Sequence, residues 1–163
     1  MNAIDLLERQ HRDVEDLFEE LDEAGEGARK TRERLCREIS DQLAIHAEIE
    51  ERLFYPESKQ PDADELIRRS VGEHLSVKRL LAEIMEGGLE DPHFAARMKV
   101  VEEQLNHHVG EEEKELFPRV RRSCSREELE ALGDRMAELA KTLIGEGEPS
   151  SRIPDQTDRN LPI

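Results

Sequence analysis

Apolar side chains recur at intervals of three and four residues along five stretches of the chain, and this spacing predicts five amphipathic α-helices. The first helix should begin after Asn2, a favourable N-cap with Asp5 three residues on. It should end at Gly25 and Gly27. Its apolar stripe consists of Ile4, Leu7, Val14, Leu17, Phe18 and Leu21. One histidine, His11, lies inside that stripe.

The second and third predicted helices are separated by a proline-containing break. The second stripe should end at Pro56, because proline inside a helix removes a hydrogen bond and clashes with the preceding turn. The third helix should open with the capping box Asp62-x-x-Glu65. We expect it to bury Ile67 and Val71 on its inner face.

The fourth and fifth predicted helices also carry recognisable start signals. Asp91 and Pro92 mark the start of the fourth helix, which should end at Pro118. The fifth helix should start at Ser125, where Glu128 completes a second capping box. Its single apolar face should pack against the other helices or cover one end of them.

The order of these elements predicts an all-α protein. Short connections between the first four helices favour an antiparallel up-down-up-down four-helix bundle over residues 1–121. An additional packing helix is expected over residues 122–144. Residues 145–163 are rich in Gly, Pro, Ser, Asp and Arg without periodicity, which predicts a disordered, flexible or loosely draped tail.

Composition agrees with this fold and disfavours several functions. Aromatic residues make up 3% of the chain and Trp is absent, which suits an aliphatic helical core. A net charge of −16 would repel a phosphate backbone, so no nucleic-acid partner is expected. No apolar run approaches the roughly 18 residues that span a bilayer. Asp5 and Glu8 stand where a signal peptide would be basic and then apolar, so we expect a cytoplasmic protein without membrane contact.

Two copies of one sequence pattern, His46-Ala-Glu-Ile-Glu50 and His108-Val-Gly-Glu-Glu112, are each followed by a proline at the same offset. A spacing of four residues places imidazole and carboxylate on one face of a helix, one above the other. The preceding helix of each half adds one inward histidine, so the chain is an internal repeat. The six inward residues are His11, His46, Glu50, His74, His108 and Glu112.

Four imidazoles and two carboxylates in one core predict a metal site. A single histidine on an apolar stripe is more often a hydrogen-bonded core residue than a ligand. Together these six groups would be very costly to bury without a positive partner, and a pair of metal ions supplies it. Nitrogen and carboxylate ligands without thiolate suit iron, manganese or zinc. Iron is favoured because carboxylate-bridged di-iron sites recur in helix bundles.

Cys36 and Cys124 lack CxxC spacing and suggest neither a zinc knuckle nor a disulfide framework.

These residues resemble the hemerythrin-like (HHE) domain family over residues 1 to about 121. The flanking segments Leu53-Phe54-Tyr55-Pro56 and Leu116-Phe117-Pro118 belong to the same match. The resemblance implies a non-haem centre of two iron ions with an oxo or hydroxo bridge. It implies bridging carboxylates from Glu50 and Glu112. The implied terminal ligands are His11, His46, His74 and His108.

The sequence departs from the oxygen-carrying hemerythrins at two positions. Those carriers have a second histidine one turn after the third-helix ligand, where this chain has Lys78. We interpret Lys78 as a solvated residue. The carriers also place the last carboxylate five residues after its histidine, which would select Glu113. The internal repeat favours Glu112, and Glu113 stays the alternative.

Other candidate ligands lie off the predicted stripes. His107 is about 100° from the ligand face of its helix, which favours a flanking or surface role. His93, beside a helix start, should be exposed. Tyr55 would ligate only if the helix unwinds before its proline, because nine residues past His46 it otherwise points away. Glu111 and Glu115 are expected to be solvated or to orient ligands.

These observations predict a redox protein that reacts with a small-molecule oxidant: hydrogen peroxide, O2 or nitric oxide. The lysine in place of a histidine leaves about two coordination positions open at octahedral metals, and this favours catalase-like peroxide decomposition over reversible O2 carriage. The alternatives are an iron- or oxygen-sensing or iron-binding module without turnover, and a metal-free helical interaction domain.

Overall fold

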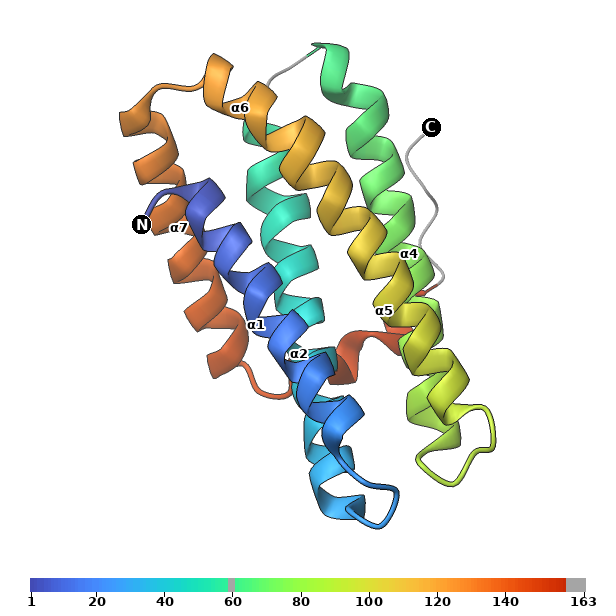
Figure 1. Cartoon of the computed structure of the whole chain (residues 1–163). Coiled ribbons are helices and arrows are strands. Elements are labelled where there is room, and N and C mark those ends of the chain that lie inside the picture. The colour runs from blue at the N-terminus through green and yellow to red at the C-terminus, as the bar shows by residue number, and fades with distance from the viewer. Residues whose placement is uncertain (59–60, 158–163) are drawn as a thin grey trace.

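The computed structural model describes residues 1–58 and 61–157, and every element in these ranges is helical. Four long helices form an antiparallel bundle: α1 (Ala3–Glu23), α2 (Arg29–Ile49), α4 (Asp64–Gly87) and α5 (Phe94–Glu111). Helix α7 (Arg126–Gly145) lies along the outer side of α1 (Figure 1). The predicted four-helix bundle with an additional C-terminal helix is confirmed. Among the described residues, no helix is both long and apolar enough to cross a bilayer.

Two predicted helix starts are confirmed by their capping geometry. The side chain of Asn2 accepts a hydrogen bond from the backbone N–H of Asp5 and caps α1. Ser125 and Glu128 form the complete capping box at the start of α7. Gly133 lets this helix approach α1 closely, since a Cβ here would lie 2.8 Å from the backbone nitrogen of Ala3.

The prediction that Pro56 and Pro118 end their helices is wrong. Helix α2 continues through a π-helical segment, η1 (Glu50–Phe54), into α3 (Tyr55–Glu57). Helix α5 continues through η3 (Glu112–Leu116) into α6 (Phe117–Ser123). In each case the proline stands in the first turn after the π-helical segment, where its missing N–H removes no bond that the preceding turn needs.

The start of α4 also differs from the prediction. Asp62 is exposed and makes no capping bond, because a 3-10 turn (η2, Pro61–Ala63) places Ala63 at the N-cap. The inner face of α4 differs from the expected stripe only near this start, because the later stripe residues His74, Val77, Leu81 and Ile84 are buried as predicted. Leu66 is buried, whereas Ile67 and Val71 are only half-buried.

Two apolar clusters divide the interior of the bundle. One joins the start of α1 to the η1, η3 and α6 segments and to α7. The other fills the opposite end, between the later turns of α1 and α4, the first and middle turns of α2 and the start of α5. The predicted polar residues belong to neither cluster, so they form a separate layer between the two.

Part of the predicted tail is draped over the bundle. Two 3-10 turns, η4 (Pro149–Arg152) and η5 (Pro154–Gln156), pack against α2 and α4. The backbone N–H of Ser150 donates to Asp41 Oδ1 at 2.9 Å, and Ile153 is fully buried. One apolar side chain and a few hydrogen bonds therefore hold a segment that has no hydrophobic period. Residues 158–163 of the predicted tail lie outside the described residues.

Candidate metal centre

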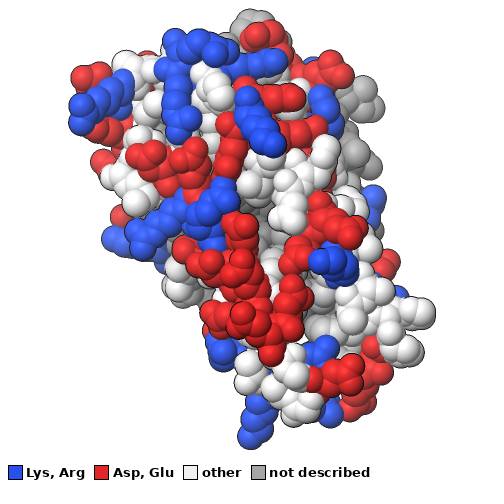
Figure 2. Space-filling view, viewed as in Figure 1, with Lys and Arg blue, Asp and Glu red and all other residues white. Residues whose placement is uncertain are grey.

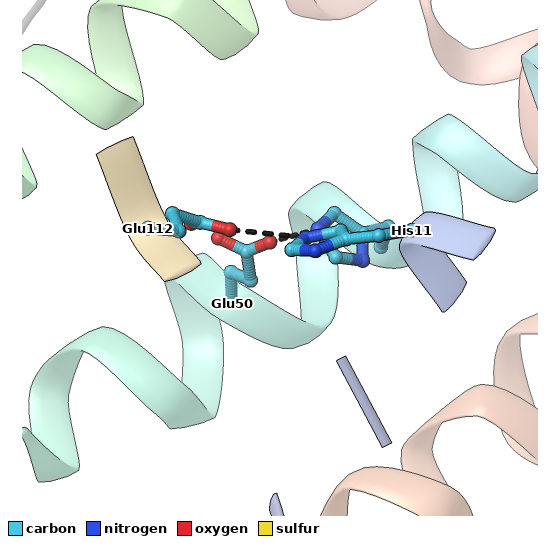
Figure 3. Close-up of side chains that lie close together, drawn as sticks. His11, Glu50 and Glu112 are labelled. Carbon is cyan, nitrogen blue, oxygen red and sulfur yellow. Dashed lines mark hydrogen bonds and ion pairs between the residues drawn. The ribbon is translucent and has the colours of Figure 1, made fainter. Parts of the chain in front are cut away.

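The six predicted ligands come together at the middle of the bundle. Helices α1 and α4 each contribute one histidine, and the α2–η1 and α5–η3 junctions each contribute a histidine and a glutamate. All six side chains are buried, and both carboxylates are fully inaccessible to solvent. Figure 3 shows Glu50 and Glu112 pointing toward each other, with His11 facing them.

The six residues form two overlapping groups of four. His11 and His46 share one group with both carboxylates, and within it one donor atom from each residue lies within 4.8 Å of the others. His74 and His108 form the equivalent group with the same two carboxylates. Two shared carboxylates flanked by two pairs of histidines can hold two cations side by side.

Each histidine presents Nε2 to the centre. His11 Nε2 lies 3.1 Å from Glu112 Oε2, and His108 Nε2 lies 3.2 Å from Glu112 Oε1. His46 Nε2 lies against Glu50 Oε1, and His74 Nε2 is 3.7 Å from Glu50 Oε2. The imidazole nitrogens and carboxylate oxygens therefore converge on one small volume.

Each outer nitrogen, Nδ1, is held by an acceptor on a different helical element. The partners are Glu113 for His11 (2.9 Å), Gln10 for His46 (2.7 Å), Glu51 for His74 (2.9 Å) and Glu73 for His108 (3.1 Å). With Nδ1 held by an outer acceptor, Nε2 is the nitrogen that each histidine has available for a metal ion. This orientation is the usual one for metal-binding histidines.

The geometry also bears on the choice between Glu112 and Glu113. Glu112 is buried in the centre between His11 and His108. Glu113 lies at the rim, where it accepts from His11 Nδ1 and forms a short ion pair with Arg12. The structure thus places Glu112 among the six converging side chains, and it places Glu113 outside them, against His11 Nδ1.

Tyr55 points into the centre, contrary to the expectation from an uninterrupted helix. The π-helical turn before it carries a backbone bond from the N–H of Tyr55 to the carbonyl of Glu50, five residues back. This wider turn rotates the following residues. The Tyr55 hydroxyl donates to Glu112 Oε1 at 2.7 Å and lies 3.4 Å from His74 Nε2.

Electrostatics in the centre couple the two carboxylates to one histidine. Burial and the neighbouring charge of Glu112 raise the pKa of Glu50 well above its usual value. Burial opposes ionisation of Glu112 as well, but the charge and hydrogen bond of His108 hold its pKa well below the usual value. Burial likewise disfavours charge on His108, yet Glu112 and Glu73 raise its pKa well above the usual value. These directions favour the neutral form of Glu50 and opposite charges on His108 and Glu112.

The remaining groups are suited to a cation. Burial, followed by the charge of His11, lowers the pKa of His46 well below its usual value, and burial also lowers the pKa of His74. Both imidazoles are therefore neutral and able to ligate. Among the described atoms, His46 Nε2 and both oxygens of Glu50 are buried without a hydrogen bond. Buried polar atoms of this kind need a partner, and a metal ion fits all of them.

Lys78 is not solvated as predicted. Its side chain is buried on α4, and its Nζ lies 4.0 Å from Oε2 of Glu51, the carboxylate that holds His74 Nδ1. The prediction failed because α4 is covered at this level by the C-terminal segment, where Ile153 is fully buried.

The other candidates lie where the sequence placed them. His107 is largely exposed and contacts Glu73 and Glu111, while His93 and Glu115 are exposed. Glu111 is half-buried and accepts from Arg69. None of these side chains belongs to the two buried groups of ligands.

A pocket of about 190 Å³ leads from the surface to the centre between α1 and α5. His11, His46 and His108 line its inner end, and the exposed side chains of Arg12 and Glu15 lie at its rim. Figure 2, viewed from this side of the molecule, shows acidic side chains gathered over the middle of the face. Such a surface disfavours anions and leaves small neutral molecules unhindered.

Sequence reasoning did not identify three of the groups that orient the histidines: Gln10, Glu51 and Glu73. A signal for them was present in the repeat. Gln10 and Glu73 each immediately precede the histidine on the first helix of a repeat half. Glu51 and Glu113 each immediately follow a buried glutamate. The pattern of one helix could not show which acceptor holds which histidine, because each of these hydrogen bonds joins two helical elements.

The sequence matches the hemerythrin HHE cation-binding domain over residues 2–120, so this chain belongs to that family. The crystal structure of a hemerythrin HHE cation-binding domain-containing protein from Mycobacterium kansasii is similar to it, with a TM-score of 0.79 and 26% identity. That similarity covers 96% of this chain and 94% of the other. It extends past the bundle, so the additional helix is part of the shared structure.

The chain is also similar to a longer protein. It is 30% identical over 130 residues to a DNA nickase from Nostoc sp.. The match covers 80% of this chain but only 36% of the length of that relative.

Proposed function

We propose that this protein binds two iron ions and decomposes hydrogen peroxide in preference to carrying O2 reversibly. The observation that supports it best is the set of four histidines whose Nδ1 atoms are held outward while their Nε2 atoms face two shared carboxylates. In this proposal His11 and His46 hold one ion, and His74 and His108 hold the other. Glu50 and Glu112 bridge the pair.

The surrounding residues support reaction with a small neutral oxidant. Bound iron would supply the redox chemistry and the oxo or hydroxo bridge that the family resemblance implies. The chain itself supplies a pocket of about 190 Å³ and an acidic face through which neutral peroxide, O2 or nitric oxide can approach. A net charge of −16 opposes approach to a phosphate backbone, so small oxidants and not DNA are the proposed substrates.

Tyr55 and Lys78 give the centre two hydrogen-bond donors near His74. Each places a side chain able to donate a hydrogen bond close to His74: the Tyr55 hydroxyl contacts the imidazole, and Lys78 is linked to it through Glu51. Such donors can hold or deliver a proton where oxygen–oxygen bond cleavage requires one. The Tyr55 hydroxyl, 2.7 Å from Glu112 Oε1, would be available as a further oxygen ligand.

Metal analysis combined with peroxide turnover tests the proposal. After anaerobic reconstitution we expect about two irons per chain, and we expect added peroxide to release O2. An optical titration with O2 should show no adduct that disappears on deoxygenation. A stable reversible adduct with negligible peroxide loss would refute the catalytic proposal, and iron binding without turnover would favour the sensing or iron-binding alternative.

A further inference from the structure

A third group of donor atoms lies outside the six buried residues, on the surface between α4 and α5. His107 and Glu111 are four residues apart on α5, and Glu73 faces them from α4. One donor atom from each of the three residues lies within 4.8 Å of the others. Each of the three immediately precedes one of the six inward residues in the sequence. The outer group therefore repeats the i,i+4 pattern of the centre one residue earlier.

The distances in this outer group suit a bound cation. His107 Nε2 lies 3.4 Å from Glu73 Oε2 and 3.2 Å from Glu111 Oε1. Ligands that are about 2.0–2.1 Å from a tetrahedral zinc ion are themselves about 3.3–3.4 Å apart. A single Nε2–H can be directed at only one of the two carboxylates, whereas a cation among the three atoms contacts them all. One nitrogen with carboxylate oxygens and no sulfur suits divalent ions such as Zn²⁺, Fe²⁺ or Mn²⁺.

Glu111 supplies a second, independent observation. Its side chain is only 12% exposed, and Arg69 Nη1 donates to its Oε1 at 2.9 Å. Its other oxygen, Oε2, is buried without a hydrogen bond to any of the described residues. A buried carboxylate oxygen without a partner carries an energetic cost that a bound cation would remove. His107, in contrast, is 65% exposed, so an ion can reach the group directly from solvent.

The equivalent positions in the other half of the repeat carry different side chains. They hold one amide and two aliphatic residues: Gln10, Ile45 and Ile49. Both isoleucines are buried in the apolar cluster that includes residues of α7. Gln10 Oε1 lies 2.7 Å from His46 Nδ1, and Glu73 Oε1 lies 3.1 Å from His108 Nδ1. An amide is thus sufficient to hold such a histidine, and the negative charge of Glu73 is available for a second task.

We propose that Glu73, His107 and Glu111 form an outer site for one divalent transition-metal ion, separate from the buried centre and joined to it by Glu73. The Oε2 atom of Glu73 faces the outer group, while its Oε1 atom holds His108 Nδ1. One carboxylate would then link the outer ion to a histidine of the centre. The outer site does not depend on which ions the centre holds, because its three donors are distinct from the six inward side chains.

A zinc titration of the iron-loaded protein tests the outer site. With the centre already filled, we expect calorimetry to show one further zinc ion per chain and elemental analysis to show unchanged iron. His107→Ala and Glu111→Gln should each weaken this binding about tenfold or more, because loss of a ligand costs at least as much as loss of a group that orients one. His93→Ala and Glu127→Gln, at exposed positions elsewhere, are the matched controls and should bind zinc like the wild type. Absence of the additional zinc, or wild-type affinity in His107→Ala, would overturn the proposal.

A substitution of Arg69 should have the opposite sign. Arg69 contacts the carboxylate of Glu111 and carries a positive charge that opposes a cation there. Arg69→Met should therefore strengthen zinc binding about two- to fivefold, as expected for removal of a half-exposed charge. Arg126→Met, which removes an arginine paired with Glu130 on α7, should leave the affinity unchanged. Binding driven only by the net charge of −16 would respond equally to both variants, and that result would contradict Glu111 as a ligand.

Glu73→Gln tests the link between the outer site and the centre. The substitution reproduces Gln10, so it keeps an oxygen for His108 Nδ1 and removes the charge from the outer group. We expect zinc affinity to fall about tenfold or more. At equal iron content, zinc should alter the optical spectrum of the iron-loaded wild type but not that of the variant. A wild-type spectrum that zinc leaves unchanged would show that Glu73 does not join the two sites.

The outer site and the proposed function fail in different ways. If the wild-type protein takes up no iron, the proposed function fails, and zinc titration of the metal-free protein still tests the outer site. His107→Ala should then bind one zinc ion fewer per chain than the wild type. If the wild type binds iron and consumes peroxide while His107→Ala binds zinc as tightly as the wild type, only the outer site is wrong.

Discussion

The two halves of the bundle, α1–α2–η1 and α4–α5–η3, place the same side chains around one centre but surround them differently. His11 corresponds to His74, and each histidine is oriented by a glutamate from the other half, Glu113 and Glu51 respectively. Phe117 stacks on His11 with ring centroids 5.9 Å apart, and Tyr55 stacks on His74 at the same separation. Each half therefore completes the surroundings of the other half's histidine, and neither half is a site by itself.

The differences between the halves are concentrated on the side of His74 and His108. Tyr55 has a hydroxyl where Phe117 has none, Lys78 replaces Glu15, and Glu73 replaces the neutral Gln10. In the proposed two-ion centre, this duplication with divergent neighbours would give the ions equal protein ligands and unequal surroundings.

The largest expected effect comes from the two carboxylates that both halves share. Glu50→Gln and Glu112→Gln should each abolish binding of both irons, because either glutamate belongs to both groups of ligands. The thermal midpoint of the iron-loaded sample should fall to that of the metal-free protein, since metal binding is coupled to folding. Elemental analysis and calorimetry measure the two effects.

The control for this prediction is His93→Ala, which should change neither iron content nor the midpoint because His93 is exposed. A variant of either glutamate that keeps one iron per chain would contradict shared bridging and would show that the halves bind independently.

The next largest effect concerns pH. Because the pKa values of Glu50 and His108 are raised well above their usual values, each group keeps its proton to a higher pH than a free side chain would, and metal must displace that proton. Affinity should therefore rise with pH, by up to about a hundredfold per pH unit for two protons, until the pH passes these raised values. His46 and His74 should contribute nothing near neutrality because their pKa values are lowered.

Calorimetric titration in buffers with different enthalpies of ionisation measures the protons released. A titration with ferrous iron or a manganous stand-in that releases no protons at neutral pH would contradict the pairing of Glu112 with a charged His108.

A smaller effect should follow from removing the glutamates that orient the histidines. Glu113→Ala and Glu51→Ala should each lower metal affinity about 10- to 100-fold without abolishing binding, because each frees one imidazole to rotate. The equivalence of the halves predicts similar losses for the two variants. Competition with a chelator provides the measurement. Complete loss of iron in Glu113→Ala, with retention in Glu112→Ala, would show that the carboxylate five residues after the histidine is the ligand.

The smallest effect is expected from making the halves more alike. Tyr55→Phe reproduces Phe117, removes the 2.7 Å bond to Glu112 and should cost the metal-free protein about 1–3 kcal/mol of unfolding free energy. Iron content should be retained while the optical spectrum and the rate of peroxide consumption change. Phe117→Leu, which keeps an apolar side chain at the equivalent position, is a control that should alter stability without altering the spectrum in the same way. An unchanged spectrum and rate in Tyr55→Phe would show that the asymmetry of the halves has no chemical consequence.

The sequence determined the arrangement of the four helices and the identity of the six inward polar residues. Both follow from local rules: a period near 3.6 selects one face of each helix, and an i,i+4 spacing aligns His46 with Glu50 and His108 with Glu112 on that face. The caps of α1 and α7 are local for the same reason, since donor and acceptor are three residues apart. The internal repeat made it possible to choose Glu112 over Glu113 without any contact information.

Tertiary structure alone decided what surrounds the six inward polar residues. Tyr55 reaches the centre only because a π-helical turn shifts the helical register by one residue, and no period in the sequence specifies that turn. Lys78 is buried because a segment near the end of the chain, around Ile153, packs over α4. The Nδ1 partners belong to other helices, so they depend on how four helices pack and not on the pattern of any one of them. Contacts between distant segments lie outside what helical periodicity can encode, and here they supply the groups that surround the six buried polar residues.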